Sequence, residues 1–233
     1  MQDRYAGDIG DYVKLALLRA IAPGRRLGIA WYLYPDEEHN TDGRHTNYLS
    51  DPDRWRTLDP GLFDGLCEVL AEERSVARLI GAGFVKATHS TEVMKFGDAP
   101  ASQRDGLRAR WFDRALALLN ECDVVFADPD NGLTDDSPER RRQKRFAKSM
   151  PLSEAVRLAD RRMAVIYHHN TRFAGGHDAE IEHWRAQLGS DTIAIRANAY
   201  SCRTFFVLNP TLEARDRIAD FCERWRHHRV FST

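Results

Sequence analysis

The chain has 233 residues, of which 42% are hydrophobic and 30% are charged, and its formal net charge is −1. This composition provides a sizeable core and excludes a globally disordered chain, while the near-zero charge argues neither for nor against a nucleic-acid partner. The first residues are polar, no stretch approaches eighteen apolar residues, and the four cysteines show no zinc-binding spacing, so we expect a cytoplasmic protein with reduced core thiols.

Apolar periodicity and turn residues predict helices and strands that alternate along the chain. The expected elements are a helix at 11–21 capped by Asp8 or Asp11, a strand at 27–34, a polar loop at 35–50, helices within 61–80, a strand at 83–89, a helix at 101–120, a strand at 124–127, a charged segment at 135–149, a helix at 151–160, a strand at 163–167, a helix at 177–188, strands at 192–196 and 203–208, and a helix from 211 to about 227.

This order of elements predicts an α/β fold with a mostly parallel, doubly wound sheet, because strands that alternate with helices pair in parallel. The last two strands are too close for a helical crossover, so we expect an antiparallel hairpin at or near the edge. The strands at 124–127 and 163–167 should lie inside the sheet. We expect one domain over 1–233, with a helical insertion around 50–120. A parallel sheet with a late antiparallel strand resembles the class I S-adenosylmethionine-dependent methyltransferase fold.

The stretch at 123–133, DVVFADPDNGL, is an apolar strand that stops abruptly in turn residues. Ligands of open α/β sheets bind beyond the carboxyl ends of the strands. We therefore expect Asp128 and Asp130 to be catalytic and Asn131 to contact substrate or cofactor. The alternative is that Asp128 caps a turn and that Pro129 merely ends the strand.

The N-terminal segment reads Tyr5-Ala6-Gly7-Asp8-Ile9-Gly10-Asp11-Tyr12-Val13-Lys14. Helical spacing puts Asp11 and Lys14 on neighbouring faces, and alone this pattern is typical of a capped helix with a weak surface ion pair. Combined with Asp128-Pro129, the segment resembles one family of bacterial large-subunit ribosomal RNA adenine-N6 methyltransferases. That family carries Ala-Gly-Asn-x-x-Asp-x-x-Lys at the start of a helix and Asp-Pro-Pro-Tyr after a later strand.

The resemblance implies methyl transfer to a nitrogen of a nucleic acid, with S-adenosylmethionine as cofactor. Lys14 and Asp128 would be active-site residues, and Asp128 would accept hydrogen bonds from the target amine. Tyr5, Asp8 and Asp11 would bind substrate or cofactor.

The loop after the first strand, 34–44, differs from the family's Ala-Gly-Ala-Gly loop, and only Asp42-Gly43-Arg44 matches its Gly-Arg. We assign Asp42 and Arg44 to substrate or cofactor binding, and we expect the loop to line the same cleft as Asp128. Its bulky acidic residues predict weak or absent binding of S-adenosylmethionine.

The same loop permits a second class of function. Carboxylates and imidazoles are ligands for Mg²⁺, Mn²⁺ or ferrous iron, so Asp36, His39, Asp42 and Asp128 could hold a metal. The protein would then be a metal-dependent hydrolase or nuclease that activates water. A solvated loop accounts for the pattern equally well.

His168-His169-Asn170 ends the strand at 163–167, and one of the two histidines should face the cleft because adjacent strand residues point to opposite sides. We assign His168 and Asn170 to substrate or cofactor binding. A simple strand-end turn is the alternative.

A basic run follows the Asp128 loop, and its side chains could contact the phosphates of a nucleic acid. Its members are Arg140, Arg141, Arg142, Lys144 and Arg145. A solvated helix with mixed charge is the alternative. The third functional class is a non-catalytic module that binds nucleic acid or protein.

Overall fold

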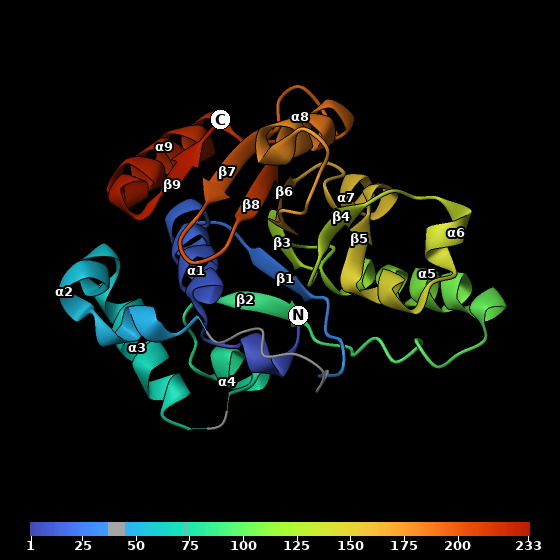
Figure 1. Ribbon diagram of the computed structural model, residues 1–233, viewed down its shortest axis with the longest axis horizontal. Coiled ribbons are helices and arrows are strands. Elements are labelled where there is room, and N and C mark those ends of the chain that lie inside the picture. Colours follow the sequence, from blue (N-terminus) through green and yellow to red (C-terminus); the bar gives the residue numbers. More distant parts are fainter. Residues whose placement is uncertain (37–44, 73) are drawn as a thin grey trace.

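The computed structural model describes residues 1–36, 45–72 and 74–233, and its centre is a seven-stranded sheet with the order β2-β1-β3-β6-β8-β7-β9 (Figure 1). The strands are β1 (Leu27–Trp31), β2 (Ala87–Ser90), β3 (Val124–Asp128), β6 (Met163–His169), β7 (Ile193–Ala197), β8 (Arg203–Leu208) and β9 (Val230–Ser232). Strands β2, β1, β3 and β6 are parallel. Strand β8 is antiparallel to β6 and β7, and β9 is antiparallel to β7.

Helices cover both faces of this sheet, which gives a three-layer α/β/α arrangement (Figure 1). One face packs against α1 (Ile9–Ile21), α3 (Pro60–Leu70), α4 (Val76–Gly81) and α9 (Leu212–Trp225), and the other against α5 (Ala101–Leu118), α7 (Leu152–Leu158) and α8 (Gly176–Leu188). Successive side chains of a strand point to opposite faces of the sheet, so they pack into different hydrophobic cores. Phe126 of β3 packs with the α1 side, whereas Val125 packs with the α5 side.

The remaining elements are short. They are η1 (Asp3–Tyr5), η2 (Asn47–Ser50), α2 (Pro52–Trp55), η3 (Arg56–Leu58), α6 (Pro138–Arg141), η4 (Lys144–Lys148), η5 (Arg226–His228), and a small parallel sheet of β4 (Gly132–Thr134) and β5 (Ser149–Pro151). Helices α2, α3 and α4 lie in the chain between β1 and β2, within the region where we expected a helical insertion.

The predicted α/β class, the inner positions of β3 and β6, and the antiparallel direction of β8 are confirmed. The core of the sheet is mostly parallel, as expected. The expectation of a single late antiparallel strand needs correction, because β9 adds a second one at the edge. This strand is only Val230–Ser232, and Phe231 is exposed on it, so it lacks the apolar run that marks an inner strand. Strands β4 and β5 were not expected either, because each spans only three residues.

Helix α1 places its first turn at the carboxyl edge of the sheet. The Asp8 side chain caps it by accepting from the backbone nitrogens of Gly10 (2.7 Å) and Asp11 (3.1 Å), an interaction worth about 1 kcal/mol. The helix is buried along most of its length, including Asp11 and Lys14. Two charged side chains are thereby carried into the interior.

No helix in the described part of the chain is long and apolar enough to cross a membrane. All four cysteines are free. Cys122 and Cys222 are buried, as expected of core thiols, whereas Cys67 is exposed on α3, which corrects the prediction that it belongs to the core.

Candidate functional site

A pocket of about 230 Å³ opens at the carboxyl edge of the sheet, beside β3 and β6. Its wall is formed by the first turn of α1, by the loop that follows β3, by the end of β6 and by the start of β8. Ligands of open α/β folds bind at this edge, so the pocket is the candidate site. Its lining includes these residues that the sequence singled out: Tyr5, Asp8, Asp11, Lys14, Asp128, Asp130 and Asn131.

The centre of the site is a buried triad of one cation and two carboxylates. Lys14 Nζ lies 2.6 Å from Asp128 Oδ2 and 2.6 Å from Asp11 Oδ1, and the Gly7 backbone nitrogen donates to Asp11 Oδ2 at 2.6 Å. As expected, Asp128 lies beside Lys14. The alternative of a weak surface pair between Asp11 and Lys14 is wrong, because both side chains are nearly inaccessible to solvent.

Burial and pairing oppose one another in this triad. Burial raises the pKa of Asp11 and of Asp128 above the ordinary value, although the Lys14 ammonium acts to lower both. Burial alone would lower the pKa of Lys14, but its two carboxylate partners outweigh this effect and raise it. We conclude that Lys14 stays charged and that it fixes the position of Asp128.

Asp130 is held by the N-terminal segment of the chain. Its Oδ2 accepts from Gln2 Nε2 at 2.6 Å, and its Oδ1 lies 2.5 Å from the Met1 nitrogen. The Met1 nitrogen also donates to the carbonyl of Tyr32 (2.7 Å), just after β1, and to that of Asp128 (3.3 Å), at the end of β3. Both Met1 and Gln2 are buried, so these residues fill the crevice between the ends of β1 and β3.

This crevice is the topological switch point of the sheet, because the chain runs from β1 to β2 on one side and later to β3 on the other. A nucleoside cofactor such as S-adenosylmethionine would need close approach of backbone there, which glycines permit. Residues 32–36 contain no glycine, and Tyr32 is fully buried with its hydroxyl donating to Glu154 Oε2 at 3.1 Å. Within the described part of this loop, residues 32–36, no glycine therefore permits the close backbone approach that such a cofactor needs.

Asp42, Arg44 and His39, which we expected to bind ligand or metal, lie outside the described residues. The described part of the predicted cleft loop, residues 34–36, does not line the pocket, so this part of the prediction is wrong; His45, which follows the loop, does line it. Asp36 is exposed, and its Oδ1 lies 3.5 Å from the Arg4 backbone nitrogen. Within 1–36, 45–72 and 74–233, no three His, Cys, Asp or Glu side chains are grouped so that they could hold a metal ion.

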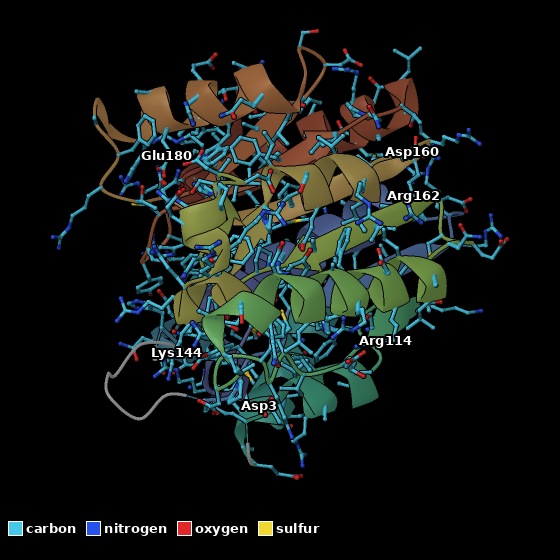
Figure 2. All side chains as sticks on the ribbon, turned by 90° about the vertical axis from the view of Figure 1, so that its right-hand side faces the viewer. Asp3, Arg114, Lys144, Asp160, Arg162 and Glu180 are labelled. Atoms are coloured by element: carbon cyan, nitrogen blue, oxygen red, sulfur yellow. The ribbon has the colours of Figure 1, made fainter. Side chains whose placement is uncertain are left out.

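The prediction for His168 and Asn170 needs correction. His168 is buried on the face of β6 opposite the pocket, where Nδ1 accepts from the Leu133 backbone nitrogen (3.0 Å) and Nε2 lies 3.2 Å from Glu180 Oε1. Asn170 donates to Glu180 Oε2 at 3.1 Å. Neither residue lines the pocket; both anchor the chain to α8, where Glu180 is labelled in Figure 2.

His169 and Tyr167 line the pocket instead, because residues two apart on a strand share a face. One of the two histidines was expected to face the cleft, and this part of the prediction holds. Sequence reasoning also missed Arg203, the first residue of β8. A charged residue that opens the otherwise apolar run Arg203–Leu208 was the available signal.

The members of the basic run differ in whether they pair with a carboxylate. Arg141 is half-buried and bound to Asp105 (2.7 Å) and Asp136 (2.6 Å), so it serves the fold. Arg140 lies 3.6 Å from Asp135, and Lys144 lies 3.9 Å from Asp98. Arg142 and Arg145 are exposed.

The end of η4, which follows this run, is tied to the site. The Asn131 backbone nitrogen, in the loop after β3, donates to the Lys148 carbonyl at 2.9 Å, which ties η4 to the pocket wall. Figure 2 shows Lys144 on the opposite side of the molecule from Asp160 and Arg162, which precede β6.

No family model matches this sequence, and a search of curated proteins gives no significant match. The chemistry of the pocket is therefore the basis for assigning a function.

Proposed function

We propose that this protein binds a nucleic acid and receives an amine-bearing base in the pocket at the carboxyl edge of the sheet, where Asp128 accepts hydrogen bonds from the exocyclic amine. The observation that carries the proposal is the contact of 2.6 Å between Lys14 and Asp128. These are the two residues that the motif resemblance assigns to the active site of an adenine-N6 methyltransferase.

The carboxylate group of Asp128 favours recognition of an amine. A carboxylate accepts hydrogen bonds and donates none, so it discriminates an amino group from a carbonyl oxygen. Lys14 holds the Oδ2 atom, and among the described residues no donor is bound to Oδ1. That oxygen is the one available to a ligand in the pocket.

Aromatic rings around the pocket support a flat ligand. Tyr5, His45, Tyr167 and His169 line it. Unpaired bases are commonly bound by stacking on such rings, at about 1–3 kcal/mol for each base. These rings offer stacking surfaces that the loop after β3 lacks, since Asp130 and Asn131 stand where the resembling family has Pro and Tyr.

The fold supports the same proposal at the level of analogy. Parallel strands followed by the antiparallel β8 resemble the class I methyltransferase sheet. Methyl transfer to the bound nitrogen is the reaction that the resemblance implies. In that reaction Asp128 would orient the amine and Lys14 would keep Asp128 in place.

Fluorescence anisotropy with short single-stranded RNAs tests the proposal. We expect an RNA with one central adenine to bind more tightly than the same RNA with uracil, since uracil presents a carbonyl to Asp128. Asp128→Asn should reduce this preference about tenfold or more, the usual effect of losing a hydrogen bond to a charged group. Asp216→Asn, on the exposed side of α9, is the matched control. Equal binding of both RNAs by the unmodified protein would contradict the proposal.

A second measurement separates binding from chemistry. The protein, the adenine RNA and S-adenosylmethionine with a tritiated methyl group are incubated, and the label in RNA is counted. Incorporation that Asp128→Asn abolishes would establish methyl transfer. Adenine-selective binding without incorporation would leave a base-binding protein that lacks this reaction.

A further inference from the structure

Arg203 is a buried cation that the described residues leave largely without hydrogen-bond partners. Its side chain is 2% exposed, and its Nη2 donates to Ser201 Oγ. Its Nε and Nη1 atoms have no hydrogen-bond partner among the described residues. No described carboxylate lies within 4.0 Å of its guanidinium. A buried guanidinium without acceptors destabilises the folded protein by several kcal/mol unless another molecule or segment supplies them.

Arg108 shows what a purely structural buried arginine looks like in the same chain. It is 1% exposed and bonds Glu154 through two nitrogens at 2.8 Å each. Its remaining capacity is taken by the carbonyls of Phe146 (3.3 Å), Ala147 (3.3 Å) and Ser149 (2.8 Å). The contrast indicates that the missing acceptors of Arg203 are not supplied by residues 1–36, 45–72 and 74–233.

The position of Arg203 points to the pocket as their source. Arg203 lines the pocket together with Lys14 and Asp128. Gly10, in the first turn of α1, lies against the guanidinium, and a Cβ atom there would be 3.2 Å from Cζ. The side chain is therefore confined between α1 and the pocket.

We infer that Arg203 binds a phosphodiester group of the nucleic acid whose base enters the pocket; this inference rests on the proposed function. The guanidinium fork matches phosphate oxygens. The pocket also contains the carboxylates of Asp8, Asp11, Asp128 and Asp130. They repel a doubly charged phosphate monoester more than a singly charged diester. The ligand is thus a base within a chain rather than a free nucleotide.

The test compares two versions of the adenine RNA, one natural and one with neutral methylphosphonate linkages on both sides of the adenine. We expect the unmodified protein to bind the natural RNA about tenfold or more tightly than the neutral one, as for charge-assisted hydrogen bonds. Arg203→Met should reduce that ratio to near one while the preference for adenine over uracil persists. Arg203→Lys should give an intermediate ratio, because the charge remains and the fork is lost.

Arg110→Met, on the exposed side of α5, is the control and should keep the full ratio. Arg203→Met should fold, because removal of an unpaired buried charge relieves a cost. A wild-type ratio in folded Arg203→Met would overturn the inference and leave adenine recognition standing. Tighter, Arg203-dependent binding of adenosine monophosphate than of the RNA would overturn the diester assignment. Failure of every RNA to bind would reject the proposed function itself.

Discussion

Lys14 and Asp128 are 114 positions apart in the chain, yet Nζ and Oδ2 lie 2.6 Å apart in a region closed to solvent. The contact joins the first helix to the end of a central strand, and Asp11 holds the ammonium from the other side at 2.6 Å. One cation therefore compensates two buried carboxylates. Removal of the Lys14 ammonium and removal of the Asp128 carboxylate should therefore destabilise the protein by different amounts.

Lys14→Met should destabilise the protein by about 3–5 kcal/mol, because it leaves two carboxylates buried without a cation. Asp128→Asn should cost less, about 1–3 kcal/mol, because Lys14 keeps Asp11 as its partner. Urea unfolding at pH 7, read by circular dichroism, gives both values. Equal losses in the two variants would contradict this account of the triad.

The pH dependence of Lys14→Met provides an internal control. Without the ammonium, the largest effect that lowers the carboxylate pKa values of Asp11 and Asp128 is lost, so burial raises both pKa values further. An acid whose pKa is raised in the folded state gains folded-state stability as pH falls. The stability gap between Lys14→Met and the unmodified protein should therefore narrow from pH 8 to pH 5.

Glu180 should produce an acid-dependent loss of stability. Burial acts to raise its pKa, but hydrogen bonds from His168, Thr171 and Asn170 outweigh burial and lower the pKa to about 2, from an ordinary 4.5. A lowered pKa contributes stability that is present above the unfolded value and is lost as pH falls toward 2. The contribution is about 3 kcal/mol at neutral pH, since one pKa unit corresponds to about 1.4 kcal/mol.

Glu180→Gln should therefore flatten the stability curve between pH 4.5 and pH 2, the window set by these two values. Urea midpoints at pH 5, 4 and 3 measure the slope for each variant. Glu182→Gln is the control, because Glu182 lies exposed on the same helix and pairs with Arg185 at 2.9 Å. A steep acid slope that persists in Glu180→Gln would show that another group controls it.

The sequence was sufficient to place the elements that carry Asp128 and Lys14. Each belongs to an element with a strong local signal: an apolar run that ends in turn residues for β3, and a capped, apolar helix for α1. The expectation that the two lie together is based on the paired motif, because Lys14 belongs to a helix and the strand-end rule applies only to Asp128. Their roles in function stay predictions until the RNA experiments are done.

The side chains of β6 that line the pocket are decided by which face of the sheet α1 covers. Tyr167 and His169 lie on that face of β6, whereas His168 points to the other. Alternation alone says that one histidine faces the cleft, and only the packing of α1 decides which one. Arg203 was missed because a single charged residue at a strand end is ordinarily exposed, whereas here it is buried with its guanidinium against Gly10.

The exposed basic residues of the run at 140–145 should control the salt dependence of RNA binding. Arg142→Ala combined with Arg145→Ala removes two exposed charges from the run. If both contact phosphate, the slope of log K against log salt should fall by about 1.4, at about 0.7 for each single-strand contact. Anisotropy titrations at several salt concentrations give the slope. Arg110→Ala combined with Arg224→Ala, exposed on α5 and α9, should leave it unchanged.

Gly132 permits the closest backbone approach beside the site, and its substitution should be severe. Its φ is +82°, and a Cβ atom there would lie 2.5 Å from the Cα atom of His168, a backbone atom that cannot rotate away. Gly24 has a similar φ of +77° but nothing within 4 Å of the added atom. Gly24→Ala should therefore cost about 1 kcal/mol from backbone strain alone. Gly132→Ala should add about 1–3 kcal/mol or more of overpacking. Urea unfolding of both variants isolates this difference, and equal losses would mean that β4 moves away from β6 without cost.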